Sequence, residues 1–222
     1  MKKLRDTLGS LLPCKIVRLK KGVVYENRYD YQKNHVKFAF NPGAKILDLG
    51  SGNHPAPFAT HLVDLFVEDN FHRGGVEIVK DNRPLIVADL EKLPFKDKEF
   101  DFVYCSHVLE HVSDPKLACQ EIIRIGKRGY IETPTRLSDM LYNFSYLHKW
   151  HVNLVGNTLI FMEYSEREKQ GTGSSYFFEE QTNPFDNETK NLVYKNREIF
   201  CNMFMWENDF EYYAFDKNGK PL

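Results

Sequence analysis

One short stretch combines the residue types that a nucleotide-like ligand needs. It reads Lys45-Ile-Leu-Asp48-Leu-Gly50-Ser-Gly52-Asn53-His54, an apolar run that ends in an acidic residue and two glycines spaced by one. This pattern is typical of the first parallel strand of an open α/β sheet, where ligands bind beyond the carboxyl ends of the strands. Glycines there allow a tight turn and a close approach of the backbone to the ligand.

Three further groups follow at spacings that place them at the same edge of a sheet. Asp64 closes an apolar run at 61–65, Asp89 follows another at 84–88, and Ser106-His107 ends a third at 100–105. A carboxylate at the end of a second strand can accept hydrogen bonds from both hydroxyls of a ribose. The spacing therefore predicts a nucleoside-containing ligand.

These residues require parallel strands to position them. Apolar runs without hairpin turns, and helical spacing over 108–125, favour a mostly parallel sheet. The predicted fold class is α/β, a Rossmann-like doubly wound, mostly parallel seven-stranded sheet with an antiparallel C-terminal strand pair. The expected strands are 46–49, 61–65, 84–88, 100–105, 128–132, 158–163, 176–180 and 210–215, and further helices are expected at 31–40, 137–150 and 197–206.

Composition limits the class of protein. The chain has 222 residues, 42% of them hydrophobic, and a formal net charge of −1. We expect a small-molecule substrate and no nucleic-acid surface, because such a surface needs a basic excess. No apolar run is long enough to span a membrane. Four scattered cysteines predict reduced thiols and a cytoplasmic location. We expect a monomer or homodimer.

The spaced combination Leu-Asp-Leu-Gly-Ser-Gly, Asp-Leu-Glu-Lys-Leu-Pro-Phe and Phe-Asp-Phe-Val-Tyr-Cys-Ser-His-Val-Leu-Glu-His-Val resembles the class I S-adenosylmethionine-dependent methyltransferases, type 11 group, over about residues 43–135. The resemblance implies S-adenosylmethionine as cofactor and S-adenosylhomocysteine as product. It places Asp64 at the ribose, and Asp89 with the Leu90 amide at the adenine. The full set of implied cofactor-binding residues is Asp48, Gly50, Ser51, Gly52, Asn53, His54, Asp64, Leu65, Asp89, Leu90, Ser106 and His107.

The chain departs from the family pattern after the second glycine. His54 stands where a third glycine is usual, and Pro55 and Pro57 follow. Only about a dozen residues separate Gly52 from Asp64, near the minimum for a crossover helix. We therefore expect a very short helix or a stiff loop there. The missing glycine also counts against a dinucleotide ligand.

Histidines supply the candidate base for methyl transfer. Histidine titrates near neutral pH, and the candidates are His107, His148 and His151. His107-Val-Leu-Glu110-His111 also matches a zinc-peptidase pattern if it is helical, but the sequence shows no convincing third ligand. We therefore predict a metal-independent direct transfer.

The residues outside the region of resemblance suggest the domain limits and the methyl acceptor. We expect an N-terminal helical lid segment at 1–40 and a single domain at 41–222, with substrate-cap elements within 135–206. A polar cap with Trp150 and several tyrosines suggests the hydroxyl of a sugar or another surface-polysaccharide precursor. The alternatives are an amine acceptor, a nucleotide-binding oxidoreductase and a non-catalytic module that binds S-adenosylmethionine.

Overall fold

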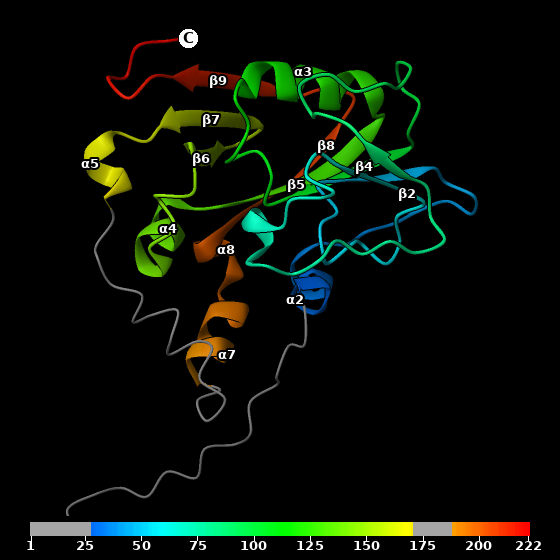
Figure 1. Cartoon of the computed structure of the whole chain (residues 1–222), viewed down its shortest axis with the longest axis horizontal. Coiled ribbons are helices and arrows are strands. Elements are labelled where there is room, and N and C mark those ends of the chain that lie inside the picture. Colours follow the sequence, from blue (N-terminus) through cyan, green and yellow to red (C-terminus); the bar gives the residue numbers. More distant parts are fainter. Residues whose placement is uncertain (1–27, 171–187) are drawn as a thin grey trace, which may run out of the picture.

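The computed structural model describes residues 28–170 and 188–222 and forms two sheets with helices around them (Figure 1). The expected strand at 176–180 and most of the expected lid at 1–40 lie outside the described residues. The helices are α2 (Arg28–His35), η1 (Phe71–Arg73), α3 (Pro115–Ile125), α4 (Arg136–Tyr142), α5 (Glu166–Lys169), α7 (Glu188–Lys195) and α8 (Arg197–Phe200). The strands are β1 (Ile46–Leu49), β2 (His61–Asp64), β3 (Leu85–Val87), β4 (Phe102–Ser106), β5 (Arg128–Pro134), β6 (Trp150–Val155), β7 (Thr158–Glu163), β8 (Cys201–Glu207) and β9 (Glu211–Phe215).

The main sheet is mostly parallel, as the sequence predicts, and six of its strands lie among the described residues, against seven expected. Their order is β3-β2-β1-β4-β5-β8, and β8 alone runs antiparallel to its neighbour. The carboxyl ends of β1, β2, β3, β4 and β5 therefore meet at one edge. That edge is where an open α/β sheet binds its ligand.

The remaining strands form a separate sheet in the order β6-β7-β9. β6 and β7 are an antiparallel hairpin, and β9 pairs with β7 in parallel. In Figure 1 this small sheet lies beside α3, and α3 contacts β9. The strands predicted at 158–163 and 210–215 thus build a second layer instead of extending the main sheet.

Alternating side chains divide the main sheet into two apolar faces. Leu47, Val103 and Ile131 face α3 and the small sheet, within a cluster that also holds Ile122 and Phe161. The opposite face carries a second cluster, rich in aromatic side chains: Ile46, Leu62, Phe102, Tyr104 and Tyr130, packed against Phe38, Phe40 and Phe58. Period-two alternation along each strand produces this division.

The crossover from β1 to β2 contains no helix, which fits the expected stiff loop. Residues 28–40 cover the sheet face that a crossover helix would otherwise cover. Tyr31 and Gln32 of α2 are buried there, and Gln32 donates a hydrogen bond to the Tyr104 hydroxyl at 2.9 Å. The short connection therefore gives the N-terminal segment a structural place against the sheet.

The four expected helices differ from the structure in extent or type, and the one predicted over 31–40 is α2 at Arg28–His35. The helix predicted over 108–125 begins only at Pro115, because Asp114 caps it by accepting from the Lys116 and Leu117 amides, and residues 108–113 form turns. The helix predicted over 137–150 ends at Tyr142, after which Asn143 has a left-handed backbone. The helix predicted over 197–206 is a single turn followed by β8, which pairs with β5 and buries Phe204 and Trp206 in the core.

Candidate functional site

A cavity of about 670 Å³ opens at the carboxyl ends of β1 to β4. One end is lined by the loops after β1, β2 and β3. The other is lined by the turn after β4 and by α4, α7, α8 and the loop that follows α4. Of the predicted cofactor and catalytic residues, the following line it: Gly50, Ser51, Gly52, Asn53, Asp64, Leu65, Asp89, Leu90, Ser106, His107 and His148.

Asp64 has the geometry of a ribose acceptor. Its Oδ2 accepts from the Gly52 amide and its Oδ1 from the Phe66 amide, both at 2.9 Å. A carboxylate oxygen has two acceptor positions, so each oxygen keeps one for a ligand hydroxyl. Arg73 Nη1 lies 4.0 Å from Oδ1, within ion-pairing distance. The same carboxylate thus fixes the glycine turn and faces the cavity.

Two observations test whether this end fits a nucleoside cofactor. The Ser51 hydroxyl is buried and has no hydrogen-bond partner among the described residues, so it is available to a ligand. Gly50 has φ +68°, and an added Cβ would come within 2.4 Å of Val108 Cγ2. Asp89 also lines the cavity, with its Oδ1 accepting from the Glu91 amide. The donor and acceptor set fits the hydroxyl and amino groups of a nucleoside.

Asp48 and His54 do not line this cavity, contrary to the sequence prediction. Asp48 shares its strand side with Ile46, and its Oδ2 accepts from the Ala56 amide at 2.6 Å. It therefore shapes the loop after β1 from the opposite face of the sheet. The His54 carbonyl accepts from the Tyr29 hydroxyl at 2.6 Å, which ties the same loop to α2.

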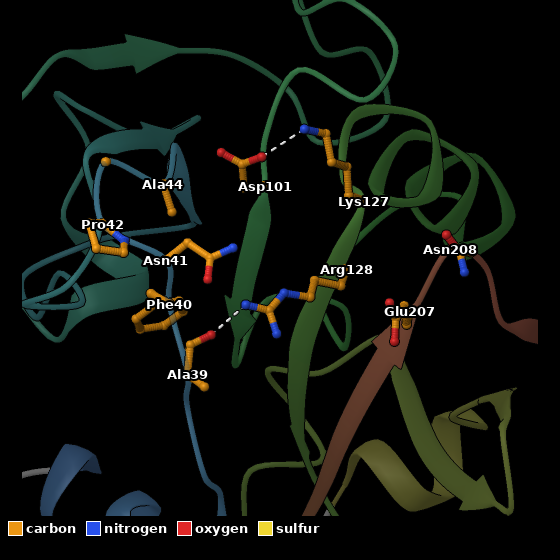
Figure 2. A pocket seen from close by; sticks show the side chains of 11 residues that line it. Ala39, Phe40, Asn41, Pro42, Ala44, Asp101, Lys127, Arg128, Glu207 and Asn208 are labelled. Atoms are coloured by element: carbon orange, nitrogen blue, oxygen red, sulfur yellow. Dashed lines mark hydrogen bonds and ion pairs between the residues drawn. The ribbon is translucent and has the colours of Figure 1, made fainter.

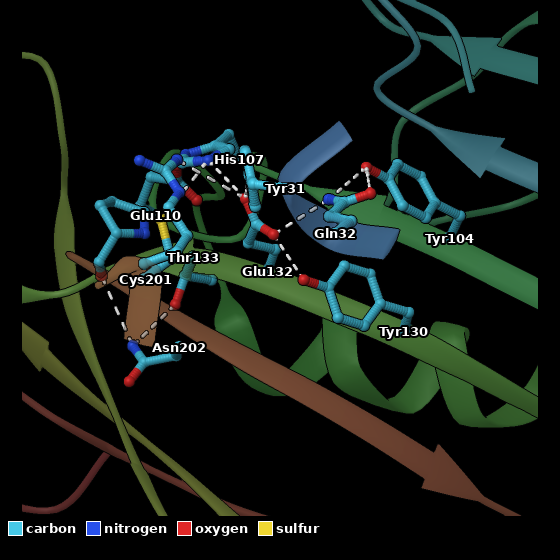
Figure 3. A network of polar contacts seen from close by, with 12 residues as sticks. Tyr31, Gln32, Tyr104, His107, Glu110, Tyr130, Glu132, Thr133, Cys201 and Asn202 are labelled. Carbon is cyan, nitrogen blue, oxygen red and sulfur yellow. Dashed lines mark hydrogen bonds and ion pairs between the residues drawn. The ribbon is translucent and has the colours of Figure 1, made fainter. Parts of the chain in front are cut away.

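Figure 3 shows a polar network around the completely buried Glu132 of β5. Its carboxylate accepts hydrogen bonds from the hydroxyls of Tyr31 and Tyr130 and, at 3.0 Å, from the Gln32 amide group. Burial alone would raise the pKa of Glu132. Hydrogen bonding from His107, and the charges of His107 and Arg197, instead hold that pKa below its usual range. Glu132 is therefore an anion whose acceptor positions are already used.

His107 lies between two carboxylates. Its Nε2 is 3.1 Å from Glu132 Oε1, and its Nδ1 is 3.5 Å from Glu110 Oε1. Burial lowers the pKa of this imidazole, but contacts with Cys201, Glu110 and Glu132 outweigh it and raise the pKa well above its usual value. A histidine that is protonated at neutral pH donates protons through both ring nitrogens. This geometry argues against His107 as the catalytic base.

A second group gathers around Glu110, in the turn that follows His107. The Glu110 carbonyl accepts from the amides of Lys149 and Trp150, at 2.9 and 3.1 Å. These backbone bonds bring His148 next to the turn, and its ring meets that of His111 edge to face at 4.8 Å. His148 Nδ1 also lies 2.9 Å from Asp139 Oδ1 of α4.

His151, the third predicted base, lies outside the cavity. It belongs to β6, and its ring packs against Tyr164 at 5.0 Å between centroids. Burial lowers its pKa, which favours a neutral, structural imidazole. The alternation of β6 turns this side chain away from the site that His148 reaches.

Figure 2 shows another hollow, of about 650 Å³, at the opposite edge of the main sheet. Three of the four charged side chains that line it have partners. Asp101 forms an ion pair with Lys127 at 2.7 Å, and Arg128 donates a hydrogen bond to the Ala39 carbonyl. Parallel strands present their amino ends here, so the hollow lacks the position expected of a ligand site.

Sequence reasoning missed several residues that shape the site, namely Tyr31, Asp139, Tyr194 and Arg197, and named Glu110 only within the zinc-peptidase pattern. Arg197 lies over the Tyr31 ring at 4.5 Å and 3.8 Å from Glu132. These residues come from helices and turns that only the tertiary fold brings together. The sequence feature that could have pointed to this part of the site is an acidic residue next to an apolar run, as at Glu110 and Glu132.

The fold is α/β, and its cavity presents donors and acceptors that suit a nucleoside. The family model described as a methyltransferase domain, type 11, matches residues 47–131. Over this region the chain is similar to S-adenosylmethionine-dependent methyltransferases, and the match implies S-adenosylmethionine as the cofactor. No helix among the described residues is long and apolar enough to cross a membrane.

Named relatives match only part of the chain. A demethylmenaquinone methyltransferase of Renibacterium salmoninarum is 37% identical over 40% of this chain and 39% of its own length. A ubiquinone/menaquinone biosynthesis C-methyltransferase of Shewanella sediminis is 32% identical over 40% of each. A solved protein of Pyrococcus horikoshii is 17% identical, covering 81% of this chain and 89% of that one, with a TM-score of 0.44. The chain thus matches about two fifths of the length of these curated relatives.

Proposed function

We propose that this chain is an S-adenosylmethionine-dependent methyltransferase that methylates a small acceptor. The observation that carries the proposal is the cavity at the carboxyl ends of the strands, with Asp64, Asp89 and Ser51 placed to bind a nucleoside. When bound, the cofactor supplies an activated methyl group. The chain's own residues hold the ribose at Asp64, the adenine beside Asp89 and the acceptor near His148.

The acceptor end of the cavity favours a polar group with an oxygen to methylate. It is lined by the charged or hydrogen-bonding side chains of Glu110, His111, His148 and Arg197. None of the relatives described above has a name connected with polysaccharides, so the sugar precursor expected from the sequence gains no support from them. We keep the coarser proposal of a polar hydroxyl acceptor.

A quinone precursor is the second candidate, because both curated relatives are named for methylation in quinone biosynthesis. Tyr142, Phe144 and Leu147 give the acceptor end an apolar wall that an aromatic ring can contact. The family model stops at residue 131, however, before this wall begins. The likeness therefore supports the cofactor half more directly than the acceptor half.

Calorimetric titration with S-adenosylhomocysteine tests the cofactor. We expect binding by the wild type and at least a tenfold loss in Asp64→Asn, because an amide nitrogen cannot accept a ribose hydroxyl. Asp101→Asn is the matched control: Asp101 also accepts a backbone amide, that of Lys45 at 2.8 Å, but at the far edge of the sheet. Absence of wild-type binding, or equal loss in both variants, would contradict the proposal.

The acceptor classes are separated by product formation with labelled S-adenosylmethionine. Demethylmenaquinone in its reduced form and a panel of sugar nucleotides are the two sets of acceptors to compare. Label in the quinone fraction would establish the second candidate. Label in the sugar fraction would restore the acceptor predicted from the sequence.

A further inference from the structure

Glu110 is a buried carboxylate with histidines at ion-pair distance but no hydrogen bond among the described residues. Its side chain is 1% exposed, and neither oxygen accepts a hydrogen bond among the described residues. The nearest cationic atoms are His107 Nδ1 at 3.5 Å and His111 Nε2 at 4.0 Å. An ionised carboxylate buried without hydrogen bonds is costly, so its retention beside a cavity points to a ligand.

Two imidazoles complete a set of donors around this carboxylate. One ligand atom each from Glu110, His111 and His148 lies within 4.8 Å of the others, and all three residues line the cavity. Ligand atoms around a tetrahedral zinc ion lie about 3.4 Å apart, given bonds of about 2.1 Å. Rotation of these side chains that moves their ligand atoms by about 1 Å would therefore bring all three within bonding distance of one ion.

A further carboxylate orients one of these imidazoles. Asp139 Oδ1 lies 2.9 Å from His148 Nδ1, and Asp139 Oδ2 accepts from the Tyr164 hydroxyl at 2.7 Å. A carboxylate behind a histidine fixes the ring and leaves the other nitrogen, Nε2, for a metal. Asp139 is completely buried and accepts from Tyr164, so its carboxylate is held beside His148 without any ion.

A neighbouring group of possible ligands, His107, Glu132 and Cys201, does not share these properties. Glu132 already accepts from two tyrosine hydroxyls, an amide and His107. Its acceptor positions are filled, whereas those of Glu110 are not. The two groups differ in the one feature that indicates a missing ligand.

We propose that Glu110, His111 and His148 bind a divalent transition-metal ion at the acceptor end of the cavity. Two imidazoles and one carboxylate suit zinc, iron, cobalt or manganese and leave positions open on the ion. An oxygen of the methyl acceptor would occupy an open position on the ion. This metal site rests on the proposed methyl transfer to a hydroxyl and adds to it a group that holds the acceptor. This replaces the metal-independent reaction expected from the sequence, where His148 could not be recognised as the third ligand.

The test uses the full chain, stripped with a chelator and titrated with Zn²⁺ by calorimetry and with Co²⁺ by visible absorption. We expect one bound ion per chain and a Co²⁺ spectrum of nitrogen and oxygen ligation. Glu110→Gln and His148→Ala should weaken binding at least tenfold. His151→Ala is the matched control, because His151 and His148 are both 7% exposed but only His148 lines the cavity.

The outcomes separate this proposal from the cofactor proposal. His111→Ala changes a partly exposed side chain, 33% accessible, so it carries the test if a buried variant does not fold. Ion binding that is absent in the wild type, or unchanged in His111→Ala and His148→Ala, overturns the metal site while S-adenosylhomocysteine binding can persist. Ion binding that is lost as expected supports the site even if S-adenosylhomocysteine does not bind.

Discussion

Gly50 joins the cofactor turn to the turn that carries Glu110, and replacing it with alanine tests that connection. Gly50 has φ +68°, a backbone conformation that costs a residue with a side chain about 1–2 kcal/mol. An alanine Cβ would also lie 2.4 Å from Val108 Cγ2, so Val108 has to move. Overpacking of this kind costs about 1–3 kcal/mol. Alanine lowers the entropy of the unfolded chain, which returns about 0.4–1 kcal/mol.

The net expectation for Gly50→Ala is a loss of about 2–4 kcal/mol in the free energy of unfolding, measured by urea titration. Gly74→Ala separates the two causes, since Gly74 has φ +60° and an added Cβ would meet nothing within 4 Å. It should cost about 1 kcal/mol or less. Adding Val108→Ala to Gly50→Ala should recover about 1–3 kcal/mol relative to the sum of the single changes.

Gly50→Ala should also weaken S-adenosylhomocysteine binding, because Val108, which would have to move, lies between His107 and Glu110, and both of these line the cavity. The reasoning is refuted if Gly50→Ala costs no more than Gly74→Ala, or if the double variant shows no coupling. Either result would mean that Val108 does not pack against the glycine turn.

Two further predictions concern groups away from the cavity. The hydrogen bond from Arg124 lowers the pKa of Glu121, so this carboxylate stabilises the fold above its unfolded pKa, and that stabilisation is lost as pH falls through the folded pKa. Glu121→Gln should cost about 1–2 kcal/mol in urea titrations at pH 7, and the difference from wild type should shrink towards pH 3. Burial raises the pKa of the Cys105 and Cys119 thiols. Both should resist alkylation at pH 8 until urea unfolds the chain, as mass spectrometry of the labelled peptides would show.

The parallel core was predictable because its signals are local. Apolar runs that end in Asp64 and Asp89 announce strand ends, and Asp114-Pro115 contains the helix start that the periodicity of 108–125 obscured. Reading that cap would have placed His107 and Glu110 in a turn. A proline disfavours the helical conformation at the residue before it, so the sequence already indicated that no helix runs through Asp114.

The acceptor half was not predictable in the same way, because tertiary contacts decide it. Residues 201–207 have no clear strand alternation from sequence alone, yet they pair with all of β5 and bury Trp206. His148 and His151 are indistinguishable as sequence neighbours. Only the backbone bonds from Lys149 and Trp150 to the Glu110 carbonyl place one at the cavity and leave the other in β6.

The three histidines predicted as bases therefore have three different environments. His107 faces Glu110 and Glu132 through both ring nitrogens, which favours a cation, and His151 packs against Tyr164 outside the cavity. Of these three, His148 combines a place in the cavity with one ring nitrogen 2.9 Å from a carboxylate oxygen, which leaves the other nitrogen for a ligand. Whether that ligand is an acceptor proton or a metal ion, the structure concentrates the acceptor chemistry at His148. An active His148→Ala enzyme would contradict both forms of this reasoning.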